Sequence, residues 1–420
     1  MQQERTAARQ RAVLAGVDTG EYDAEISMQE LCELAETAGA QVVGTVLQRR
    51  PSLDGATCLG SGRLEELKGF CQEQGVELAI FDHELTAAQI RNIERILEIP
   101  AIDRTALILD IFAQRARTSE GRLQVELAQL EYRLPRLAGL GTSLSRLGGG
   151  IGTRGPGETK LESDRRHIRG RIQALKRQLE EVDRRRQLIR SRRRKDGIPT
   201  VAIVGYTNVG KSTLLGTLTD AGVLAEDQLF ATLDPTARAL SLPDGRTVML
   251  IDTVGLVRRL PHQLVSAFRS TLEEAVQADL ILMVCDASSD EMEEQADVTR
   301  QLLGELGAGG IPVVMALNKC DRLPRFPARA GERVPISAKT GQGLPELLDT
   351  LARALGPTQV RMQLLLPYTA GGLLEEIRRE GKILSEEYLP EGIRAEALVD
   401  QKIAYKAEPY ARPHTENAGE

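Results

Sequence analysis

The chain has 420 residues, enough for two or three domains, and a net charge of −6 at pH 7. Its five cysteines form no Cys-x-x-Cys pair and its four histidines are scattered, which favours free thiols in a reducing compartment and offers no metal-binding spacing. The N-terminus lacks the apolar core of a signal peptide, and no apolar run approaches the ~20 residues of a membrane span, so we expect a cytoplasmic protein without stable membrane insertion.

Residues 1–115 alternate between short apolar runs and segments with helical spacing. Strands are expected at 12–17, 41–47, 78–81 and 101–103. Ser27 and Thr86 are candidate N-caps for two of the helices between them. Because strands alternate with helices, this region is predicted to be a small parallel α/β domain.

A glycine-rich step, Gly60-Ser61-Gly62-Arg63, precedes one of these helices. Backbone N–H groups at a helix start can bind an anion or a second nucleotide. No Gly-Lys-Ser follows, however, and a helix start with flexible glycines explains the same residues. We favour this structural interpretation.

Residues 116–197 have a different pattern. Leucine and isoleucine recur at spacings of three and four in two stretches, Leu123–Leu137 and Ile168–Ile189. Two such seams, joined by a glycine-rich loop, predict an antiparallel helical hairpin whose apolar stripes pack on each other. Pro135 should bend the first helix near its end.

The loop and the second helix of this hairpin point to a partner. Ordering so many glycines over 144–160 costs conformational entropy, which contact with a partner could offset. The second helix is strongly basic in a chain that is acidic overall, and its basic residues are Arg165, Arg166, Arg169, Arg171, Lys176, Arg177, Arg184, Arg185, Arg186, Arg190, Arg192, Arg193, Arg194 and Lys195. A charge run is usually a solvated face, but clustered arginine suits phosphate backbones, so we favour structured RNA.

Residues 198–356 open with an apolar run that leads into Gly205-Tyr206-Thr207-Asn208-Val209-Gly210-Lys211-Ser212, followed by helical spacing. Strand, Gly-x-x-x-x-Gly-Lys-Ser and helix in this order predict a phosphate-binding loop. The two glycines bring backbone N–H groups near phosphate oxygens. Lys211 can reach the β- and γ-phosphates and the Ser212 hydroxyl can ligate Mg²⁺. The alternative, a glycine-rich turn with a surface lysine, is weakened by four further motifs.

Two of these motifs address the γ-phosphate and the metal. The first is Phe230-Ala231-Thr232-Leu233-Asp234, in which Thr232 is placed to complete the Mg²⁺ shell. The second is Asp252-Thr253-Val254-Gly255, at the end of a strand-like run. Asp252 can hold the outer Mg²⁺ shell, and the Gly255 N–H can meet the γ-phosphate. The residues predicted to be catalytic are Lys211, Thr232 and Gly255.

The other two motifs address the base. In Asn318-Lys319-Cys320-Asp321, the Asp321 carboxylate can accept hydrogen bonds from guanine N1–H and the exocyclic amine, a donor pair that adenine lacks. Asn318 can bind purine N7 and tie the loops together, while the Lys319 stem lies along the base. In Ser337-Ala338-Lys339, the Ala338 N–H can meet guanine O6. Together the five motifs resemble the signatures of translation-factor-type GTPases, which bind GTP and GDP.

Residues 357–420 predict a small βαββ domain without visible chemistry, with strands at 360–366, 382–388 and 393–399 and a helix at 370–380. Contact with a partner and packing on the GTPase domain are equally compatible with this pattern. From about residue 408 on we expect disorder. The predicted fold class is therefore a multidomain α/β protein with domains at 1–115, 116–197, 198–356 and 357–420.

This order of domains resembles the HflX family over essentially the whole chain. The most diagnostic segments are Leu-Gly-Gly-Gly-Ile-Gly-Thr-Arg-Gly-Pro-Gly-Glu-Thr-Lys-Leu-Glu at 147–162 and Phe-Ala-Thr-Leu-Asp-Pro-Thr at 230–236. The resemblance implies a ribosome-associated GTPase that binds the large subunit, and we expect it to be a monomer. It implies that the hairpin loop reaches ribosomal RNA near the peptidyl-transferase region, and that the GTP-bound protein splits stalled or idle ribosomes under stress.

Two departures bear on the mechanism. Ras-like enzymes carry a water-orienting glutamine directly after Asp-x-x-Gly, but this chain has Leu256, so we expect slow intrinsic hydrolysis and strong stimulation by ribosomes. Asn208 stands where potassium-activated relatives carry an asparagine, so the resemblance implies K⁺ near the phosphates; the alternative is that Asn208 only caps the loop.

A function of another class stays open at this stage. The protein could be a GTP-dependent regulator or scaffold that acts on proteins through its coiled-coil hairpin. Salt-sensitive co-sedimentation with ribosomes would favour the ribosome factor, whereas binding unaffected by nuclease and salt would favour the scaffold. An RNA-modifying GTPase is a weaker third alternative, because the sequence shows no catalytic cysteine or cofactor pocket.

Overall fold

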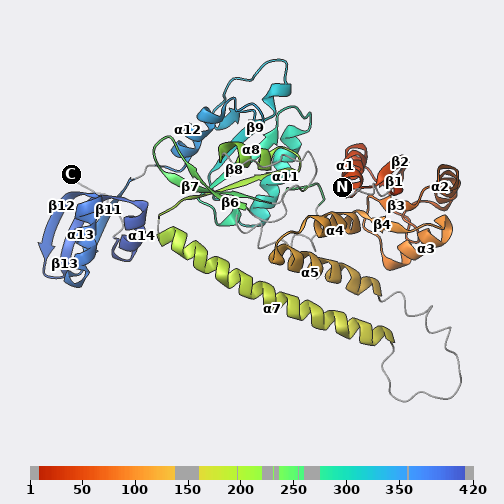
Figure 1. Ribbon diagram of the computed structural model, residues 1–420, viewed down its shortest axis with the longest axis horizontal. Helices are drawn as coiled ribbons and strands as arrows, with labels where there is room; N and C mark the ends of the chain where they lie inside the picture. Colours follow the sequence, from red (N-terminus) through yellow and green to blue (C-terminus); the bar gives the residue numbers. More distant parts are fainter. Residues whose placement is uncertain are drawn as a thin grey trace, which may run out of the picture. The chain divides into compact units, whose positions relative to one another are not determined.

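The computed structural model describes residues 9–137, 160–195, 197–219, 230, 236–253, 255–259, 275–356 and 359–411 (Figure 1). The chain divides into two compact units. The first unit comprises 1–181, 226–234 and 254–271, and the second comprises 182–225, 235–253 and 272–420. Two short segments of the GTPase region therefore belong to the same unit as the N-terminal domain.

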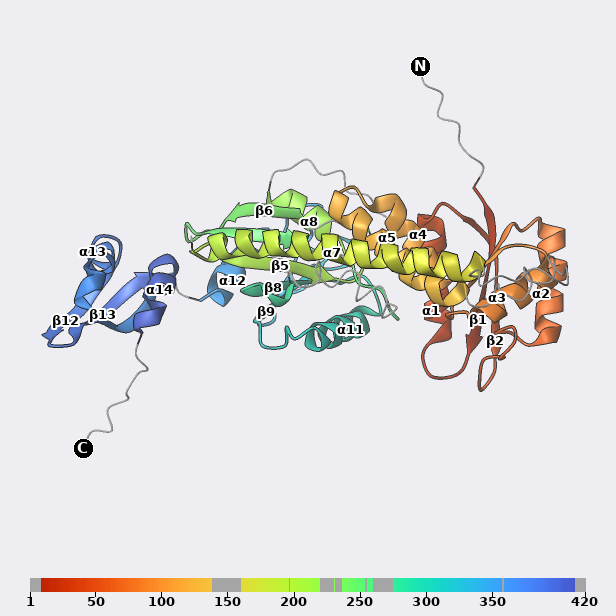
Figure 2. The same cartoon turned by 90° about the horizontal axis from the view of Figure 1, so that it is seen from below.

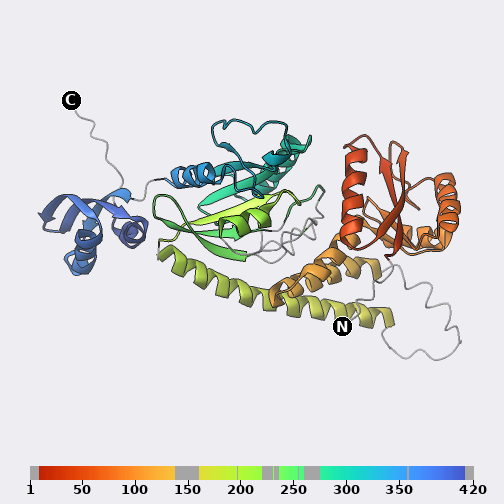
Figure 3. The ribbon, with the colours of Figure 1, turned by 45° about the horizontal axis from the view of Figure 1, so that its top comes forward.

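The N-terminal domain is a parallel sheet with helices on both faces, as predicted. Its strands are β1 (Arg11–Asp18), β2 (Gln41–Arg49), β3 (Leu78–Phe81) and β4 (Ala101–Asp103), in the order β2-β1-β3-β4. Its helices are α1 (Ala24–Thr37), α2 (Ser61–Gln74), α3 (Ala87–Leu97) and α4 (Arg104–Arg115). Helices α1 and α4 contribute to one core and α2 and α3 to the other, on opposite faces of the sheet (Figure 3).

The helix starts in this domain show one wrong prediction and one confirmed. Ser27 does not cap α1, because Asp23 already does so by accepting hydrogen bonds from the N–H groups of Glu25 and Ile26. Ser27 is instead buried inside the helix. Thr86 does cap α3, and it forms a capping box with Gln89. Serine and aspartate are comparably good N-caps, so sequence alone does not decide between Ser27 and Asp23.

The predicted hairpin consists of α5 (Ser119–Arg136) and α7 (Lys160–Lys195), which lie side by side in all three ribbon views. Leu127, Ile172 and Leu175 form the buried centre of their contact, which confirms the packing of the apolar stripes. Pro135 lies in the last turn of α5, one residue before its end. Residues 144–159 of the glycine-rich loop lie outside the described residues.

The second unit contains a six-stranded sheet in the order β10-β9-β8-β5-β7-β6. The strands are β5 (Thr200–Gly205), β6 (Thr236–Ser241), β7 (Thr247–Asp252), β8 (Leu280–Asp286), β9 (Val313–Asn318) and β10 (Arg333–Pro335). All neighbours are parallel except β6, which runs antiparallel to β7. Helices α8 (Lys211–Leu218) and α11 (Met292–Glu305) lie on opposite faces (Figure 2), and α12 (Leu344–Ala354) contacts β9 and β10.

The C-terminal region forms the predicted βαββ unit and continues further. It consists of β11 (Gln359–Leu366), α13 (Gly371–Glu380), β12 (Lys382–Leu389) and β13 (Gly392–Asp400), with sheet order β11-β13-β12. An unpredicted helix, α14 (Gln401–Ala407), follows; Asp400 caps it and Ile403 is fully buried. Short 3-10 turns occur at Cys320–Arg322, Tyr368–Ala370 and Glu408–Tyr410, so the expected disorder is wrong for residues 408–410. Within the described part of the chain, no helix is long and apolar enough to cross a membrane.

Candidate nucleotide-binding site

The candidate site lies where the parallel strands of the second unit end. Because β5, β7, β8, β9 and β10 run parallel, their carboxyl ends meet at one edge of the sheet. Ligands of open α/β sheets bind outside this edge. The residues that the strand ends place there are Gly205, Asp252, Asp286, Asn318 and, two residues after β10, Ser337. The sheet thus brings the loop motif and the base-recognition motifs together.

Two backbone positions of the loop require glycine. Gly205 has φ +152°, and a Cβ there would lie 2.2 Å from the carbonyl oxygen of Val284. Gly210 has φ +92°, and a Cβ there would lie 2.4 Å from Asn318 Nδ2. Any side chain would therefore push the loop away from the neighbouring strand ends. Asn208 is exposed and left-handed at φ +60°, a conformation that asparagine tolerates better than most residues.

Lys211 begins α8 and is buried under the loop. Its Nζ donates hydrogen bonds to the carbonyl oxygens of Gly205 at 3.0 Å and Tyr206 at 2.7 Å. Burial lowers the pKa of Lys211 to about 8, against the opposing effect of the nearby Asp252 carboxylate. The ammonium is thus held by neutral carbonyls, and a phosphate would supply the counter-charge that these lack.

The next residue, Ser212, lies beside the end of β7. Its Oγ donates to Asp252 Oδ2 at 2.9 Å. Thr253 anchors the following step, because its Oγ1 donates to the carbonyl oxygen of Ile203 at 2.7 Å. A hydroxyl and a carboxylate are the hard oxygen donors that Mg²⁺ prefers, so this pair fits a magnesium site next to bound phosphates. Thr232, the third predicted ligand, lies outside the described residues.

On the base side, Asn318 connects the loop with the last motif. Its Nδ2 donates to the carbonyl oxygen of Val209 at 2.8 Å, and its Oδ1 accepts from the Ala338 N–H at 2.9 Å. The tie between loops that the sequence predicted is therefore present. The Ala338 N–H, predicted to meet guanine O6, is already engaged by Asn318, so the base would have to share this donor.

The exposed carboxylate of Asp321 is oriented by Ser337. The Ser337 Oγ donates to Asp321 Oδ1 at 2.7 Å, and this bond is the main cause that lowers the pKa of Asp321. The side chain is thereby kept ionised as a pure hydrogen-bond acceptor. An acceptor-only group is what the N1–H and amine donors of guanine require.

Sequence reasoning missed Asp286, the last residue of β8. Its Oδ2 lies 2.7 Å from Lys319 Nζ, and this ion pair fixes the Lys319 stem. The available signal was an apolar run, 280–285, that ends in an aspartate in the same way as the run before Asp252. Sequence can place such a residue at the strand edge, but not pair it with a lysine 33 positions later.

The remaining predicted site residues divide into three groups. In the second unit, Tyr206, Thr207, Val209, Thr253 and Cys320 are buried around the loops, and Lys339 is exposed. Phe230 and Gly255 belong to the first unit. Predicted residues outside the described part of the chain are Ala231, Thr232, Leu233, Asp234 and Val254.

A parallel sheet with a Gly-x-x-x-x-Gly-Lys-Ser loop and an Asn-x-x-Asp motif at its carboxyl edge defines a P-loop GTPase. Three family models match the chain: "GTP-binding GTPase N-terminal" at 25–113, "GTP-binding GTPase Middle Region" at 115–193 and "50S ribosome-binding GTPase" at 200–319. The third assigns the GTPase domain to the ribosome-binding type. The protein binds guanine nucleotides and hydrolyses GTP.

The relatives give the family. The chain is 51% identical over 395 residues to the GTPase HflX of Caldanaerobacter subterraneus subsp. tengcongensis, which covers 94% of this chain and 92% of the relative. It is 44% identical to the GTPase HflX of Escherichia coli, with 88% of each chain covered. A GTP-binding protein from the archaeon Sulfolobus solfataricus, solved with GDP, is 25% identical at a TM-score of 0.43 and covers 82% of this chain and 98% of its own. The chain belongs to the HflX family of GTPases.

Proposed function

We propose that the protein is a cytoplasmic, monomeric factor that binds the large ribosomal subunit through ribosomal RNA. In its GTP-bound form it dissociates stalled or idle ribosomes under stress, and hydrolysis releases it. The proposal rests on the match of residues 200–319 to a 50S ribosome-binding GTPase and on the basic helix α7. The four domains predicted from sequence remain part of it, with the hairpin as the RNA-contacting arm.

The observation that carries the proposal is the distribution of charge on α7. Arg171 and Lys176 pair within the hairpin, with Glu126 at 2.6 Å and Glu131 at 2.8 Å, and these contacts hold α5 against α7. Further basic side chains are exposed on the same helix; among the described ones these are Arg166, Arg169, Arg177, Arg184, Arg185 and Arg192. A helix with this excess of exposed arginine suits a phosphate backbone better than an acidic or apolar protein surface.

Binding to purified large subunits tests this arm. In the GTP-analogue state, co-sedimentation should weaken steeply between low and moderate salt, because phosphate contacts release counterions. The double variant Arg169→Glu/Arg177→Glu should lose most of the binding. Arg300→Glu/Arg325→Glu, which makes the same charge change on exposed positions of the GTPase domain, is the matched control. Binding that ignores salt, nuclease and the α7 variant would reject the RNA-binding arm and favour the scaffold function.

Ribosome dissociation needs its own measurement. Light scattering of intact ribosomes should fall after addition of the protein with a GTP analogue and stay constant with GDP. The GTP turnover rate should rise strongly with added large subunits. If subunits bind but scattering is unchanged in both nucleotide states, the protein is a ribosome-associated GTPase without splitting activity.

The roles of the site residues are part of the proposal. Lys211 binds the β- and γ-phosphates, Ser212 ligates Mg²⁺ directly and Asp252 holds it through water, while Thr232 and Gly255 respond to the γ-phosphate. When bound, Mg²⁺ neutralises charge on the phosphate oxygens. Ser212→Ala should raise the Mg²⁺ concentration needed for half-maximal GTP binding. Thr217→Ala, five residues further along α8 and without a predicted metal contact, should not. An unchanged Mg²⁺ titration for Ser212→Ala would remove Ser212 from the metal site.

Water positioning and potassium complete the proposed mechanism. Leu256 has no polar group, so the attacking water must be oriented by another group, and we assign this to the ribosome-bound state. Asn208, exposed on the loop, is proposed to help hold K⁺ beside the phosphates. GTP turnover should then be faster in KCl than in NaCl at equal ionic strength, and Asn208→Ala should abolish the difference. Equal rates in the two salts would leave Asn208 a loop residue only.

A further inference from the structure

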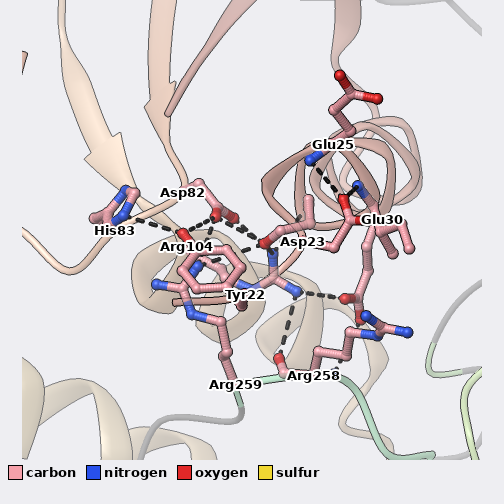
Figure 4. Close-up of polar contacts among 11 residues, drawn as sticks. Tyr22, Asp23, Glu25, Glu30, Asp82, His83, Arg104, Arg258 and Arg259 are labelled. Atoms are coloured by element: carbon pink, nitrogen blue, oxygen red, sulfur yellow. Dashed lines mark hydrogen bonds and ion pairs between the residues drawn. The ribbon is translucent and has the colours of Figure 1, made fainter. Parts of the chain in front are cut away.

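The carboxyl edge of the N-terminal sheet holds a cluster of buried charges that the nucleotide site does not use (Figure 4). Asp82 follows β3 and is 2% exposed. Its Oδ1 accepts from Arg104 Nη1 at 2.7 Å, and its Oδ2 accepts from Ser27 Oγ at 2.7 Å. Arg104, which begins α4, also pairs with Glu30 of α1 at 2.8 Å. Three elements of the domain thus converge on one polar centre.

Two residues from the GTPase sequence complete this centre. Arg259 Nη1 lies 2.7 Å from Asp82 Oδ2, and its guanidinium stacks over the Tyr22 ring at 4.3 Å (Figure 4). The backbone of Arg258 is bound as well: its N–H donates to Glu30 at 3.2 Å, and its carbonyl accepts from Arg104 at 3.4 Å. The domain therefore binds both the side chain and the main chain of this segment.

Apolar contacts anchor this segment and also a second one, at Phe230, which belongs to the same compact unit. Val257 and Phe230 are both buried in the core that α1 and α4 build. The Phe230 ring meets Phe112 of α4 edge-on, with centroids 4.6 Å apart and planes at 86°. Such aromatic pairs stabilise beyond the area that they bury. Phe230 stands two residues before Thr232, and Val257 two residues after Gly255.

We propose that this face of the N-terminal domain is a receptor for two segments, the one that begins at Phe230 and residues 255–259, which precede or contain the groups assigned to the γ-phosphate. Glu30, Asp82 and Arg104 are then positioning residues for GTP. The inference rests on the roles proposed above for Thr232 and Gly255. The anchors at Val257 and Arg258, two and three residues after Gly255, restrict where the Gly255 N–H and its neighbours lie, and Phe230 anchors the start of the other segment. Ordering them in advance spares GTP the entropy of doing so, whereas GDP makes no γ-phosphate contact and gains nothing.

A double-mutant cycle on the full-length protein tests the receptor. Asp82→Asn, Arg259→Gln and the double variant are titrated with a fluorescent GTP analogue and with GDP. Each single variant should lower the affinity for the GTP analogue by about fivefold or more, while the affinity for GDP stays within about twofold of wild type. The double variant should bind the analogue no more weakly than the single variant with the lower affinity, because both substitutions remove the same contact. Losses that multiply, or a gain in analogue affinity, would overturn the proposal.

Arg136→Gln is the matched control within the same domain. Arg136 pairs with buried Asp103 at 3.0 Å and stacks over Tyr132 at 3.5 Å. Its other hydrogen bonds within the described part of the chain go to the carbonyl oxygens of Tyr132 and Leu85, and none reaches residues 255–259. It should leave the ratio of analogue to GDP affinity unchanged. If it shifts the ratio as far as Asp82→Asn does, general loosening of the domain explains the effect and the proposal fails.

A separate readout distinguishes failure of the receptor from failure of the Gly255 role. Gly255→Pro removes the N–H, and an unchanged analogue affinity would reject the γ-phosphate contact itself. Hydrogen exchange then tests docking alone: Arg259→Gln should speed amide exchange in α1 and at the start of α4 relative to wild type. Unchanged exchange there would show that the segment does not dock in solution.

Discussion

The N-terminal sheet and the GTPase sheet use the carboxyl ends of their parallel strands in opposite ways. At the GTPase edge, two glycines and a buried lysine leave the loop backbone available to an external anion. At the N-terminal edge, Asp82 and Arg104 are paired with each other and with residues 258–259 of the same chain. One fold principle, polar residues at the carboxyl ends of parallel strands, thus serves a ligand in one domain and a chain segment in the other.

The electrostatics of two buried residues express this difference. Burial lowers the pKa of Lys211 to about 8, because removal from water disfavours the charged ammonium more than the nearby Asp252 carboxylate favours it. Burial would raise the pKa of Asp82, but Arg104 and Arg259 together with the Ser27 hydroxyl outweigh it and hold that pKa below its ordinary value. The lysine therefore gains from a new counter-charge, whereas the aspartate already has its partners.

Removing a partner from the N-terminal edge should have the largest effect. Arg104→Leu leaves Glu30 and Asp82 without the guanidinium between them, and breaking a buried ion pair costs about 3–5 kcal/mol. Denaturant unfolding should show this loss in the N-terminal domain, while GDP binding persists to higher denaturant. Arg49→Leu, a change at a side chain 91% exposed, is the control and should be nearly neutral. A loss below about 1 kcal/mol for Arg104→Leu would mean that the cluster is solvated in solution.

Changing the acceptor at the GTPase edge should have the next largest effect, and it should be a change of specificity. Asp321→Asn replaces one acceptor by an amide donor that opposes the guanine amine, so GTP affinity should fall by about 100-fold. Xanthosine triphosphate carries a carbonyl where guanine has the amine, and it should bind the variant better than wild type. Competition titration measures both. Asp297→Asn, at an exposed position on α11, should change neither; equal losses for both nucleotides would indicate a misfolded loop.

The comparison also shows what sequence could predict. The GTPase edge was largely predictable, because Gly205 to Ser212 are contiguous and the strand before them is a single apolar run. The N-terminal edge was not, because Asp82 and Arg259 are 177 positions apart and neither lies in a periodic pattern. Ser27 illustrates the same limit: serine is a common helix N-cap, but the Ser27 hydroxyl donates a hydrogen bond to Asp82. Contacts over such separations depend on tertiary packing, which local propensity does not encode.

The pH dependence of nucleotide affinity should show the third largest effect, and the pKa of Lys211 determines it. Phosphate binds the ammonium form, so above pH 8 binding must take up a proton, and affinity should fall about tenfold per pH unit. The stability of the nucleotide-free protein should change in the opposite direction. Charging a lysine with a depressed pKa is a cost below pH 8, and this cost is relieved as pH rises toward the unfolded value of about 10.4.

Calorimetric titration with GDP between pH 7 and 9 measures this dependence. Lys211→Arg provides the control, because a guanidinium stays charged over the whole range and its affinity profile should be flat. A wild-type profile as flat as that of Lys211→Arg would place the lysine pKa well above 9 and would contradict the burial argument.

A substitution of Leu256 should have the smallest effect. Leu256 lies in the segment that the N-terminal domain binds, so this substitution tests how firmly that segment is held. Leu256→Gln restores the residue of Ras-like enzymes, yet turnover without ribosomes should change by less than about threefold, or under about 0.7 kcal/mol. The reason is the position of Leu256, which is 5% exposed. It lies two residues before Arg258, whose N–H binds Glu30, and three residues before Arg259, which pairs with Asp82. A glutamine there is directed into packed surroundings, and Leu256→Met controls for the change of shape. A tenfold faster Leu256→Gln enzyme would instead show that the segment leaves the N-terminal domain readily during turnover.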